Sequence, residues 1–405
     1  MRSTHIFFQW FDAGQKTSES LVREQEPFGL RAAESALVAV VIASHREDVR
    51  TLGSHDDNKQ IAVAEILGLG EMRNVVLRVG VEGLGRRPET TNAFSATSGF
   101  VDDGSSDQTL SVARQFSSET VSAVTQENQG AAAARNKALE MCQGDYIQWL
   151  DADDLISPDK IARQVEAVEE GRSKRILFSS GWGCFMYRPA KARFIPTPLW
   201  NDLSPAEWLL RKWETNSHMQ TATWLVSREL TEAAGPWDTR LLGDDDGEYF
   251  CRVVLASTEI RFEPKSKVFY RITPSSRLSH IGRSGKKIEA QFLGMKLQIS
   301  YLLALADNKR VRAACLNYLQ TWLPAFYPDR PDIVEEAQAL AATLGGRLEI
   351  PRMGWKYAWI EKPFGPHAAK EARVRYNRSK SSVARMWDKV LYSLESPRRK
   401  SEVRS

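Results

Sequence analysis

Residues 121–272 alternate between short apolar runs and longer segments of helical period, which predicts an α/β domain. Helices are predicted over 128–142, rich in alanine, and over 157–170, with Ser157 as the N-cap. The predicted strands are "DYIQWL" (145–150), "RILFSS" (175–180), "TATWLV" (221–226) and "KVFYRI" (267–272).

The strand pattern ends before Gly285, and only helical period follows. Apolar residues recur at spacings of three and four from Ile288 to Leu302, which predicts one buried helical face. A second apolar stripe, flanked by cations, comprises Val383, Met386, Trp387, Val390, Leu391 and Leu394. This stripe either rests on an anionic membrane surface or, as is more common for amphipathic helices, docks on its own domain with a solvated basic face.

The first hundred residues are the least regular part. "LVAVVIAS" (37–44) predicts a buried strand, but residues 46–100 keep neither the strand nor the helix period. The segment "NAFSATSG" (92–99) is a poor β segment, so we expect no regular strand directly before Asp102.

Composition favours a globular protein with one large domain and an appendage. The chain has 405 residues, 42% of them hydrophobic, and a formal charge of +4. Residues 351–405 carry 14 Lys and Arg against 5 Asp and Glu, so the basic character belongs to the C-terminus. Four cysteines without CxxC spacing, short apolar runs and no signal-peptide pattern predict a cytoplasmic protein with reduced thiols.

An acidic cluster follows the predicted strand 145–150, in "YIQWLDADDL". Asp151, Asp153 and Asp154 would therefore lie at the carboxyl edge of the sheet, where open α/β sheets bind ligands. Two carboxylates separated by one residue suit a hard cation that is shared with a substrate phosphate. For an isolated cluster, a solvated turn that caps the next helix would be the commoner explanation.

Four acidic or glycine-rich blocks occur in a fixed order: "VDDGSSDQT" (101–109), "ENQGAAAARNKAL" (127–139), "GDYIQWLDADD" (144–154) and "GPWDTRLLGDDDGEYFCRV" (235–253). In order and approximate spacing they resemble the family 2 glycosyltransferases of the GT-A fold. The resemblance implies a Rossmann-like mixed sheet flanked by helices and followed by a helical region. It divides the chain into an atypical, disordered segment (1–35), a GT-A domain (36–285, with 36–100 poorly matched) and a helical C-terminal region with a basic tail (286–405).

The same resemblance implies a metal-dependent, inverting glycosyltransferase. The donor would be a UDP-, GDP- or dTDP-sugar, and the cofactor Mn²⁺ or Mg²⁺. The acceptor would be a hydroxyl of a glycan or lipid-linked molecule in glycan, glycolipid or cell-surface polysaccharide synthesis. No nucleic-acid partner is expected, and the basic C-terminal helix would make any peripheral contact with the inner face of the membrane.

Residue roles follow from the matched motifs. Asp102 and Asp103 match the acid pair that binds the nucleotide. Gly130 would let the backbone approach the donor, and Arg135 would contact the donor or brace the loop. Asp151 matches the first acid of the DxD motif, which serves the sugar nucleotide and the metal.

Asp153 matches the second acid of the DxD motif and is the expected direct metal ligand. Asp246, beside Asp245, stands in the place of the catalytic base that takes the proton of the acceptor hydroxyl. Neighbouring carboxylates raise one another's pKa, which favours this role. Asp244, Asp245, Asp246 and Glu248 have a simpler alternative explanation: acidic residues are common at the N-terminus of a helix, where the helix dipole stabilises them.

Other residues carry weaker signals. Trp182, Trp200, Trp208, Trp213, Trp224 and Trp237 precede the expected base, and one or two of these six would line the acceptor pocket while the rest form core. His280 would add a metal or phosphate contact, although a lone histidine is more often structural.

Two other functions remain open. An irregular N-terminal half-site, compatible with a shifted reading frame near residues 90–94, would leave a catalytically impaired homologue that acts as a binding or scaffold protein. A nucleotidyltransferase would need a basic glycine-rich loop near the N-terminus, for which "GLGEMR" (68–73) and "EGLGRR" (82–87) are weak candidates.

Overall fold

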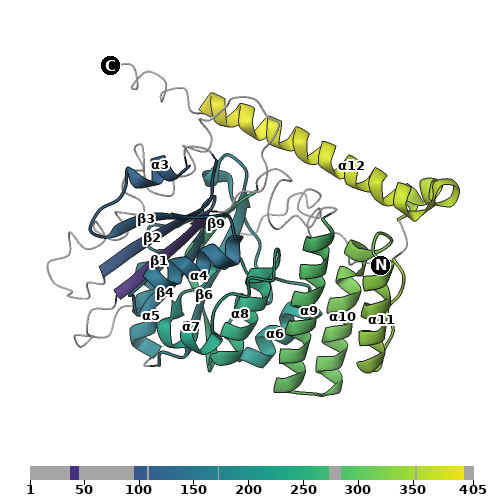
Figure 1. Ribbon diagram of the computed structural model, residues 1–405, viewed down its shortest axis with the longest axis horizontal. Helices are drawn as coiled ribbons and strands as arrows, with labels where there is room; N and C mark the ends of the chain where they lie inside the picture. The colour runs from purple at the N-terminus through teal and green to yellow at the C-terminus, as the bar shows by residue number, and fades with distance from the viewer. Residues whose placement is uncertain are drawn as a thin grey trace, which may run out of the picture.

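The computed structural model describes residues 37–44, 95–106, 109–171, 173–272, 284–351 and 354–395. Over these ranges the strands form a five-stranded and a four-stranded sheet, with helices around them. Helices α9, α10 and α11 stand side by side next to the sheets, and the long α12 crosses one end of the molecule (Figure 1).

The five-stranded sheet has the order β3-β2-β1-β4-β8. Its strands are β1 (Leu37–Ser44), β2 (Ser95–Asp103), β3 (Val121–Gln126), β4 (Tyr146–Asp151) and β8 (Val226–Ser227). All neighbours are parallel except β8, which runs antiparallel to β4. In the register of β1, Ser44 pairs with Asp102 and Ala43 with Asp151. The acidic ends of β2 and β4 are therefore separated by β1 alone.

The sequence-based expectation of no strand before Asp102 is wrong, because β2 includes Ser95 to Asp103. Its residues pair on one side with β1, the strand that was predicted at 37–44, and on the other side with β3. Two parallel neighbours supply the ladder of backbone hydrogen bonds, so tertiary context overrides weak intrinsic β propensity. The remaining irregular stretch, 45–94, and the terminal 1–36 lie outside the described residues.

The four-stranded sheet has the order β5-β9-β6-β7. Its strands are β5 (Leu155–Ile156), β9 (Glu259–Arg271), β6 (Ile176–Phe185) and β7 (Arg193–Phe194). β6 and β9 run parallel, with an irregularity between Ser180 and Gly181. The strands predicted at 175–180 and 267–272 are confirmed, and both are longer than the apolar runs that indicated them.

Short helices connect and cover the sheets. They are α3 (Thr109–Arg114), α4 (Ala131–Met141), α5 (Lys160–Gly171), η2 (Pro189–Lys191), α6 (Pro205–Glu214), η3 (Thr221–Thr223), α7 (Arg228–Ala234) and α8 (Asp245–Ala256). The two predicted helices are α4 and α5. The strand predicted at 221–226 is wrong for most of its length, since η3 occupies its first half. Ser157 is not the predicted cap, because its Oγ accepts a hydrogen bond from the backbone N–H of Lys267 on β9.

The C-terminal helices are α9 (Gly285–Leu305), α10 (Lys309–Phe326), α11 (Pro331–Thr343) and α12 (Trp355–Glu395), the last with a break at Gly365. The predicted apolar face of α9 is confirmed, because Ile288, Phe292, Met295, Ile299 and Leu302 are all buried. Five of the six stripe residues of α12 are exposed and Leu391 is half-buried, so the predicted packing of this stripe on the domain is wrong for those five. The other side of the helix contacts the domain. The division of the chain into domains stays a prediction.

Most of the predicted aromatic cluster belongs to the core. Trp208, Trp213, Trp224 and Trp237 are at most 2% exposed. Trp213 stacks on Tyr318 of α10 with ring centroids 4.9 Å apart, which joins the sheet domain to the C-terminal helices.

Candidate functional site

Asp102 and Asp103 close strand β2 and are almost completely buried. Oδ2 of Asp102 accepts hydrogen bonds from Thr125 Oγ1 at 3.1 Å and from the backbone N–H of Ser105 at 3.3 Å. Its Oδ1 is buried and has no hydrogen-bond partner in the described part of the chain. A buried carboxylate oxygen without a donor is costly, so this position favours a ligand that brings hydroxyl or N–H groups.

Asp103 braces the loop between β3 and α4. Its Oδ1 accepts hydrogen bonds from Gln126 Nε2 at 2.8 Å and the backbone N–H of Gln129 at 2.9 Å. Its Oδ2 accepts one from the N–H of Gly130, also at 2.9 Å. Gly130 is the N-cap of α4 with φ 97°, a backbone conformation that residues other than glycine rarely adopt. The acid pair thus divides into one carboxylate with an open acceptor and one that shapes the neighbouring loop.

The acids that follow β4 are held differently from one another. Asp154 is completely buried, and its carboxylate accepts hydrogen bonds from Gln220 Nε2 and from the backbone N–H of Arg271. Asp153 and Asp151 are partly exposed. The side chain of Arg271 donates to the backbone carbonyl of Asp153 at 2.9 Å, which fixes the loop against β9. Asp154 is therefore structural, and the two DxD carboxylates face the accessible side.

Arg135 of α4 joins the DxD loop to the start of α8. One Nη donates to Asp151 Oδ1 at 2.9 Å and the other to Asp245 Oδ2 at 2.6 Å. The guanidinium also lies over the ring of Trp237, 4.5 Å from its centroid. Both neighbouring carboxylates raise the pKa of Arg135, against the effect of burial. In this arrangement Arg135 braces two acidic segments, and its contact with a donor stays a prediction.

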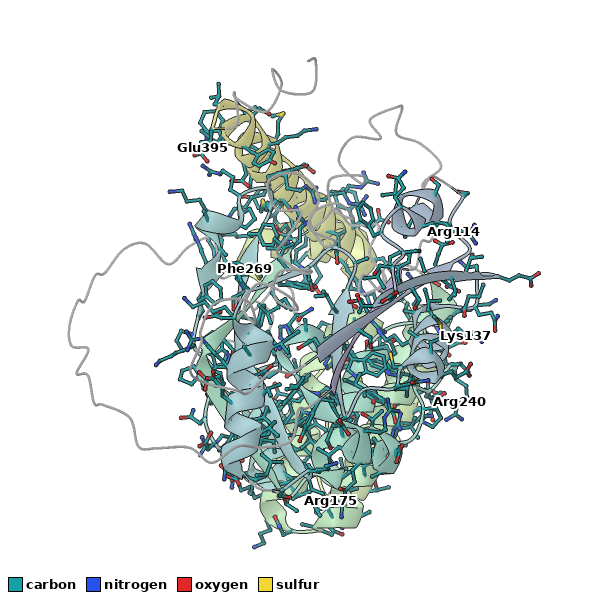
Figure 2. The ribbon with its side chains drawn as sticks, turned by 90° about the vertical axis from the view of Figure 1, so that its left-hand side faces the viewer. Arg114, Lys137, Arg175, Arg240, Phe269 and Glu395 are labelled. Carbon is teal, nitrogen blue, oxygen red and sulfur yellow. The ribbon has the colours of Figure 1, made fainter. Side chains whose placement is uncertain are left out.

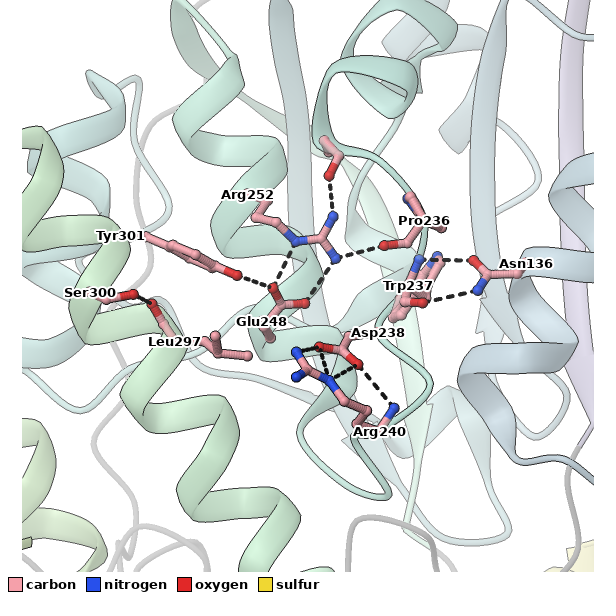
Figure 3. Close-up of polar contacts among 11 residues, drawn as sticks. Asn136, Pro236, Trp237, Asp238, Arg240, Glu248, Arg252, Leu297, Ser300 and Tyr301 are labelled. Carbon is pink, nitrogen blue, oxygen red and sulfur yellow. Dashed lines mark hydrogen bonds and ion pairs between the residues drawn. The ribbon is translucent and has the colours of Figure 1, made fainter. Parts of the chain in front are cut away.

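Trp237 is fixed from two sides. Its backbone N–H donates to Asn136 Oδ1 at 2.8 Å, and Asn136 Nδ2 donates back to its carbonyl at 2.9 Å (Figure 3). Its ring stacks on Tyr249 at 4.0 Å. Trp237 is therefore a buried platform beneath Arg135, and the expectation that one or two tryptophans of the cluster line an acceptor pocket stays a prediction.

The third acidic cluster opens helix α8. Asp246 Oδ2 accepts a hydrogen bond from Thr221 Oγ1 at 3.2 Å, and Oδ1 accepts one from the N–H of Gly247 at 2.9 Å. Glu248 is separate from this group, because its buried carboxylate binds Arg252 and the hydroxyl of Tyr301 (Figure 3). The first turn of α8 thus keeps Asp245 and Asp246 at the site and turns Glu248 into the core.

Asp244 adopts the left-handed conformation with φ 56° and folds back over α8. Its carboxylate accepts hydrogen bonds from Gln291 and Gln298 of α9 and from Tyr318 of α10. A Cβ at position 247 would overlap this carboxylate, so the motif requires a glycine there. The C-terminal helices therefore hold the acidic turn in place.

Burial perturbs the carboxylates of this turn. It raises the pKa of Asp244 to about 6, against the attraction of Lys212 and with the help of Asp246. It raises the pKa of Asp245 to about 6 as well, against the attraction of Arg135. Strongly shifted carboxyl groups gathered at one sheet edge are typical of functional sites.

His218 and Thr221 are residues at this site that the sequence did not indicate. Solvent reaches the ring of His218, yet surrounding protein desolvates it enough to lower its pKa, while the Asp246 carboxylate opposes that shift. The ring packs against Trp182 with centroids 4.8 Å apart. No spacing in "NSHMQT" (216–221) could have revealed this, because the contacts are made with distant segments.

The residues of the site fit a metal that is shared with a substrate. No group of three or more His, Cys, Asp or Glu side chains poised to hold a metal exists among the described residues. Mg²⁺ and similar cations are often bound by one or two carboxylates plus substrate phosphates, which Asp151 and Asp153 could supply. The predicted contact from His280 lies outside the described residues.

Comparison with known proteins is consistent with this geometry. Residues 99–232 match the family model described as "Glycosyl transferase family 2". An uncharacterized glycosyltransferase of Haemophilus influenzae is 43% identical over 69 residues, which are 16% of this chain and 28% of that protein. The glycosyltransferase GlyA of Streptococcus pneumoniae is 27% identical over 185 residues, which are 44% of this chain and 26% of that protein. The matches therefore span less than a third of these relatives.

A solved structure shares the fold more widely. The crystal structure of residues 1–349 of TarS from S. aureus, in complex with UDP-GlcNAc, superposes with a TM-score of 0.52 at 15% identity. The match covers 78% of this chain and 81% of that chain. At this identity the likeness concerns the fold alone, and it extends into the C-terminal part of the chain.

Proposed function

We propose that the protein, whose residues 99–232 match the family 2 glycosyltransferase model within a GT-A fold, transfers a sugar from a nucleotide donor to a hydroxyl acceptor. The observation that carries the proposal is the meeting of the three acidic segments at one sheet edge. β1 alone separates Asp102 from Asp151, and Arg135 joins Asp151 to Asp245.

The donor is proposed to bind with its nucleoside over the end of β2. Oδ1 of Asp102, which has no hydrogen-bond partner among the described residues, would accept hydrogen bonds from the base or the ribose hydroxyls. TarS is described in complex with UDP-GlcNAc, so a UDP-sugar is the first donor to test. The diphosphate would then extend past the end of β1 toward the DxD loop after β4, because that is the neighbouring strand.

Asp153, with Asp151, is proposed to hold a divalent cation together with the diphosphate. Such a cation neutralises the negative charge that builds on the leaving diphosphate. Asp151 also pairs with Arg135, so the protein already offsets part of the charge of this loop before a cation binds. Cation binding should therefore be weak alone and strengthened by the nucleotide.

Asp246 is proposed as the general base and Asp245 as its supporting neighbour. Asp245 forms an ion pair with Arg135, whereas Asp246 accepts hydrogen bonds from two neutral donors, the Thr221 hydroxyl and the backbone N–H of Gly247. A carboxylate that is not neutralised by a cation is the better proton acceptor. The acceptor oxygen would form its bond to the anomeric carbon as the bond to the diphosphate breaks, with the hydroxyl proton passing to Asp246. Attack from the side opposite the diphosphate inverts that carbon.

The acceptor is proposed to enter beside Asp246, where His218 and Trp182 lie together. Aromatic and imidazole surfaces suit the flat faces of sugar rings. The competing idea of an impaired homologue rested on the irregular first hundred residues, of which 45–94 lie outside the described residues. The formed strand β2 and the hydrogen-bonded Asp103 favour the enzyme.

A donor panel tests the proposal. The full chain is incubated with UDP-GlcNAc and with other UDP-, GDP- and dTDP-sugars, in Mn²⁺, in Mg²⁺ and in excess chelator. Water takes the place of the acceptor hydroxyl, so the donor is hydrolysed to the free sugar and nucleoside diphosphate, and the nucleoside diphosphate is measured. We expect release from at least one donor, its loss in chelator and its loss in Asp246→Asn. Asp238→Asn is the matched control, because Asp238 lies in the same motif but pairs with the exposed Arg240 (Figure 3). Undiminished release by Asp246→Asn, or no release from any donor, contradicts the proposal.

A further inference from the structure

Helix α12 presents an unusual outer surface. Val383, Met386, Trp387, Val390 and Leu394 are between 45% and 68% exposed. Their spacings of three, one, three and four place them on one side of a helix. We call this set the outer stripe. Tyr376 continues it toward the break at Gly365, and the exposed Trp355, Trp359 and Phe364 lie before that break.

The opposite side of α12 is the one that contacts the protein. Asp388 accepts hydrogen bonds from the backbone N–H of Tyr187 and from Arg188, and Glu395 pairs with the same arginine. Farther along, Lys370 donates to the carbonyls of Ala325 and Tyr327. Asp388 is two residues from Met386, or about 200° around a helix of 3.6 residues per turn. The outer stripe therefore points away from the rest of the molecule.

The charges of α12 are sorted in the same way. The helix carries nine Lys and Arg against four Asp and Glu. Two of the four acids, Asp388 and Glu395, are turned toward Arg188. By helical position, Arg375 and Lys380 flank the outer stripe on its two sides, and Lys389 lies about 60° beyond Met386 on the side of Arg375. Arg378 and Arg385 lie farther round, toward the opposite side of the helix. An exposed apolar stripe with tryptophan and cationic borders fits an anionic lipid surface.

The contact with Arg188 also relates α12 to the site. Tyr187 and Arg188 come two and three residues after Phe185, the last residue of β6, which pairs with Arg271 of β9. Arg271 holds both Asp153 and Asp154. Figure 2 shows Glu395 near one end of the molecule, Arg175, which precedes β6, near the other, and Phe269 between them on the side of Glu395. The helix thus lies at the end of the sheet that carries the DxD loop.

We propose that the outer stripe of α12 docks on an anionic membrane surface and holds the DxD end of the sheet close to that surface. The helix would lie in the plane of the headgroups with its apolar side chains inserted and its cations on anionic lipids. No described helix is both long and apolar enough to cross a bilayer. The second part of the proposal rests on the proposed function, since it implies an acceptor carried by the membrane.

Vesicle flotation tests the docking without any catalysis. The full chain is mixed with vesicles of phosphatidylcholine containing phosphatidylglycerol, or of phosphatidylcholine alone. We expect flotation with the anionic vesicles and at least tenfold less with the neutral ones. Flotation should be lost in 0.5 M salt, because salt screens the attraction between the cationic side chains and the anionic lipids. Trp387→Glu combined with Met386→Glu should reduce flotation at least tenfold.

The control is Leu305→Glu, which places one negative charge on an exposed apolar residue of α9, and it is compared with Trp387→Glu alone as well as with the double variant. It should float like the unmodified protein, and circular dichroism should show the same helix content in all variants. Equal flotation of the Trp387 variant contradicts the proposal. A second result would also contradict it: the protein does not bind lipid, light scattering shows a stable dimer, and Trp387→Glu dissociates that dimer. The stripe would then be an interface between two copies. Nucleoside diphosphate release measured without vesicles reports separately on the proposed function.

Discussion

The acidic turn that ends β2 and the acidic turn that opens α8 are similar in sequence and different in physical state. Asp102 and Asp103 are nearly inaccessible and bind hydroxyl, amide and backbone N–H groups. Asp245 and Asp246 remain partly exposed, and burial raises the pKa of Asp245 although Arg135 binds it. On the proposed function, the first turn would accept hydrogen bonds from the donor, and the second would take up the proton of the acceptor hydroxyl.

The largest expected effect is on turnover in the α8 turn. Asp246→Asn keeps the size and the hydrogen bond from Thr221 but removes the proton acceptor. We expect kcat to fall by roughly 10² to 10⁴ while the KM for the donor changes less than threefold. Steady-state release of nucleoside diphosphate measures both constants. A loss confined to KM would assign Asp246 to binding and remove the distinction between the two turns.

The β2 turn should respond in the opposite sense. Asp102→Asn retains an oxygen for Ser105 and Thr125 but places an NH₂ group where the unpartnered Oδ1 stands. Loss of a charged hydrogen bond costs about 1.5 to 3 kcal/mol, so donor affinity should fall roughly 10- to 150-fold with kcat nearly unchanged. Calorimetric titration of the variant with the donor nucleotide gives the affinity. Unchanged affinity would show that the nucleoside binds elsewhere.

The smallest expected effect concerns stability and pH. Burial raises the pKa of Asp244 to about 6, above the value near 4 expected in the unfolded chain. Between pH 4 and 6 the folded state therefore binds more protons, so the contribution of Asp244 to stability falls as pH rises and stays low above pH 6.

Asp244→Asn removes this dependence, and asparagine tolerates the left-handed backbone. After the weaker hydrogen bonds with Gln291 and Gln298 are allowed for, we expect a gain of about 1 to 2 kcal/mol at pH 7 and none at pH 4. Urea unfolding at the two pH values measures it. An equal effect at both would mean that the carboxyl group does not titrate as described.

The sequence predicted the contents of the site better than its connections. The order of the four acidic and glycine-rich blocks and the periods of α4, α5, β4 and α9 were sufficient to predict the fold. They could not indicate that Arg135 joins Asp151 to Asp245, because residues 135 and 245 are 110 positions apart and meet only after folding. Nor could they separate Asp154, which is bonded and buried, from its neighbour Asp153.

Local propensity failed where tertiary contacts decide. Small and polar residues in Ser95–Asp103 suggested no strand, yet parallel neighbours on both sides form β2. The apolar run 221–226 suggested a strand, but its first half forms η3 and places Thr221 beside Asp246. In α12 the sequence correctly predicted an apolar stripe on one side of the helix, but the prediction that this stripe is buried was wrong. Periodicity shows which residues share one side of a helix, and it does not show whether another part of the protein covers that side.

Binding of a nucleoside diphosphate tests the central claim most directly. The full chain is titrated calorimetrically with UDP, GDP and dTDP, each with Mn²⁺ and with chelator. The account predicts that one of the three binds with a Kd of roughly 1 μM to 1 mM, more tightly with Mn²⁺ than with chelator, and that Asp102→Asn weakens it. No binding of any of the three by a folded protein, or binding that Asp102→Asn leaves unchanged, would contradict the assignment of this sheet edge as a sugar-nucleotide site.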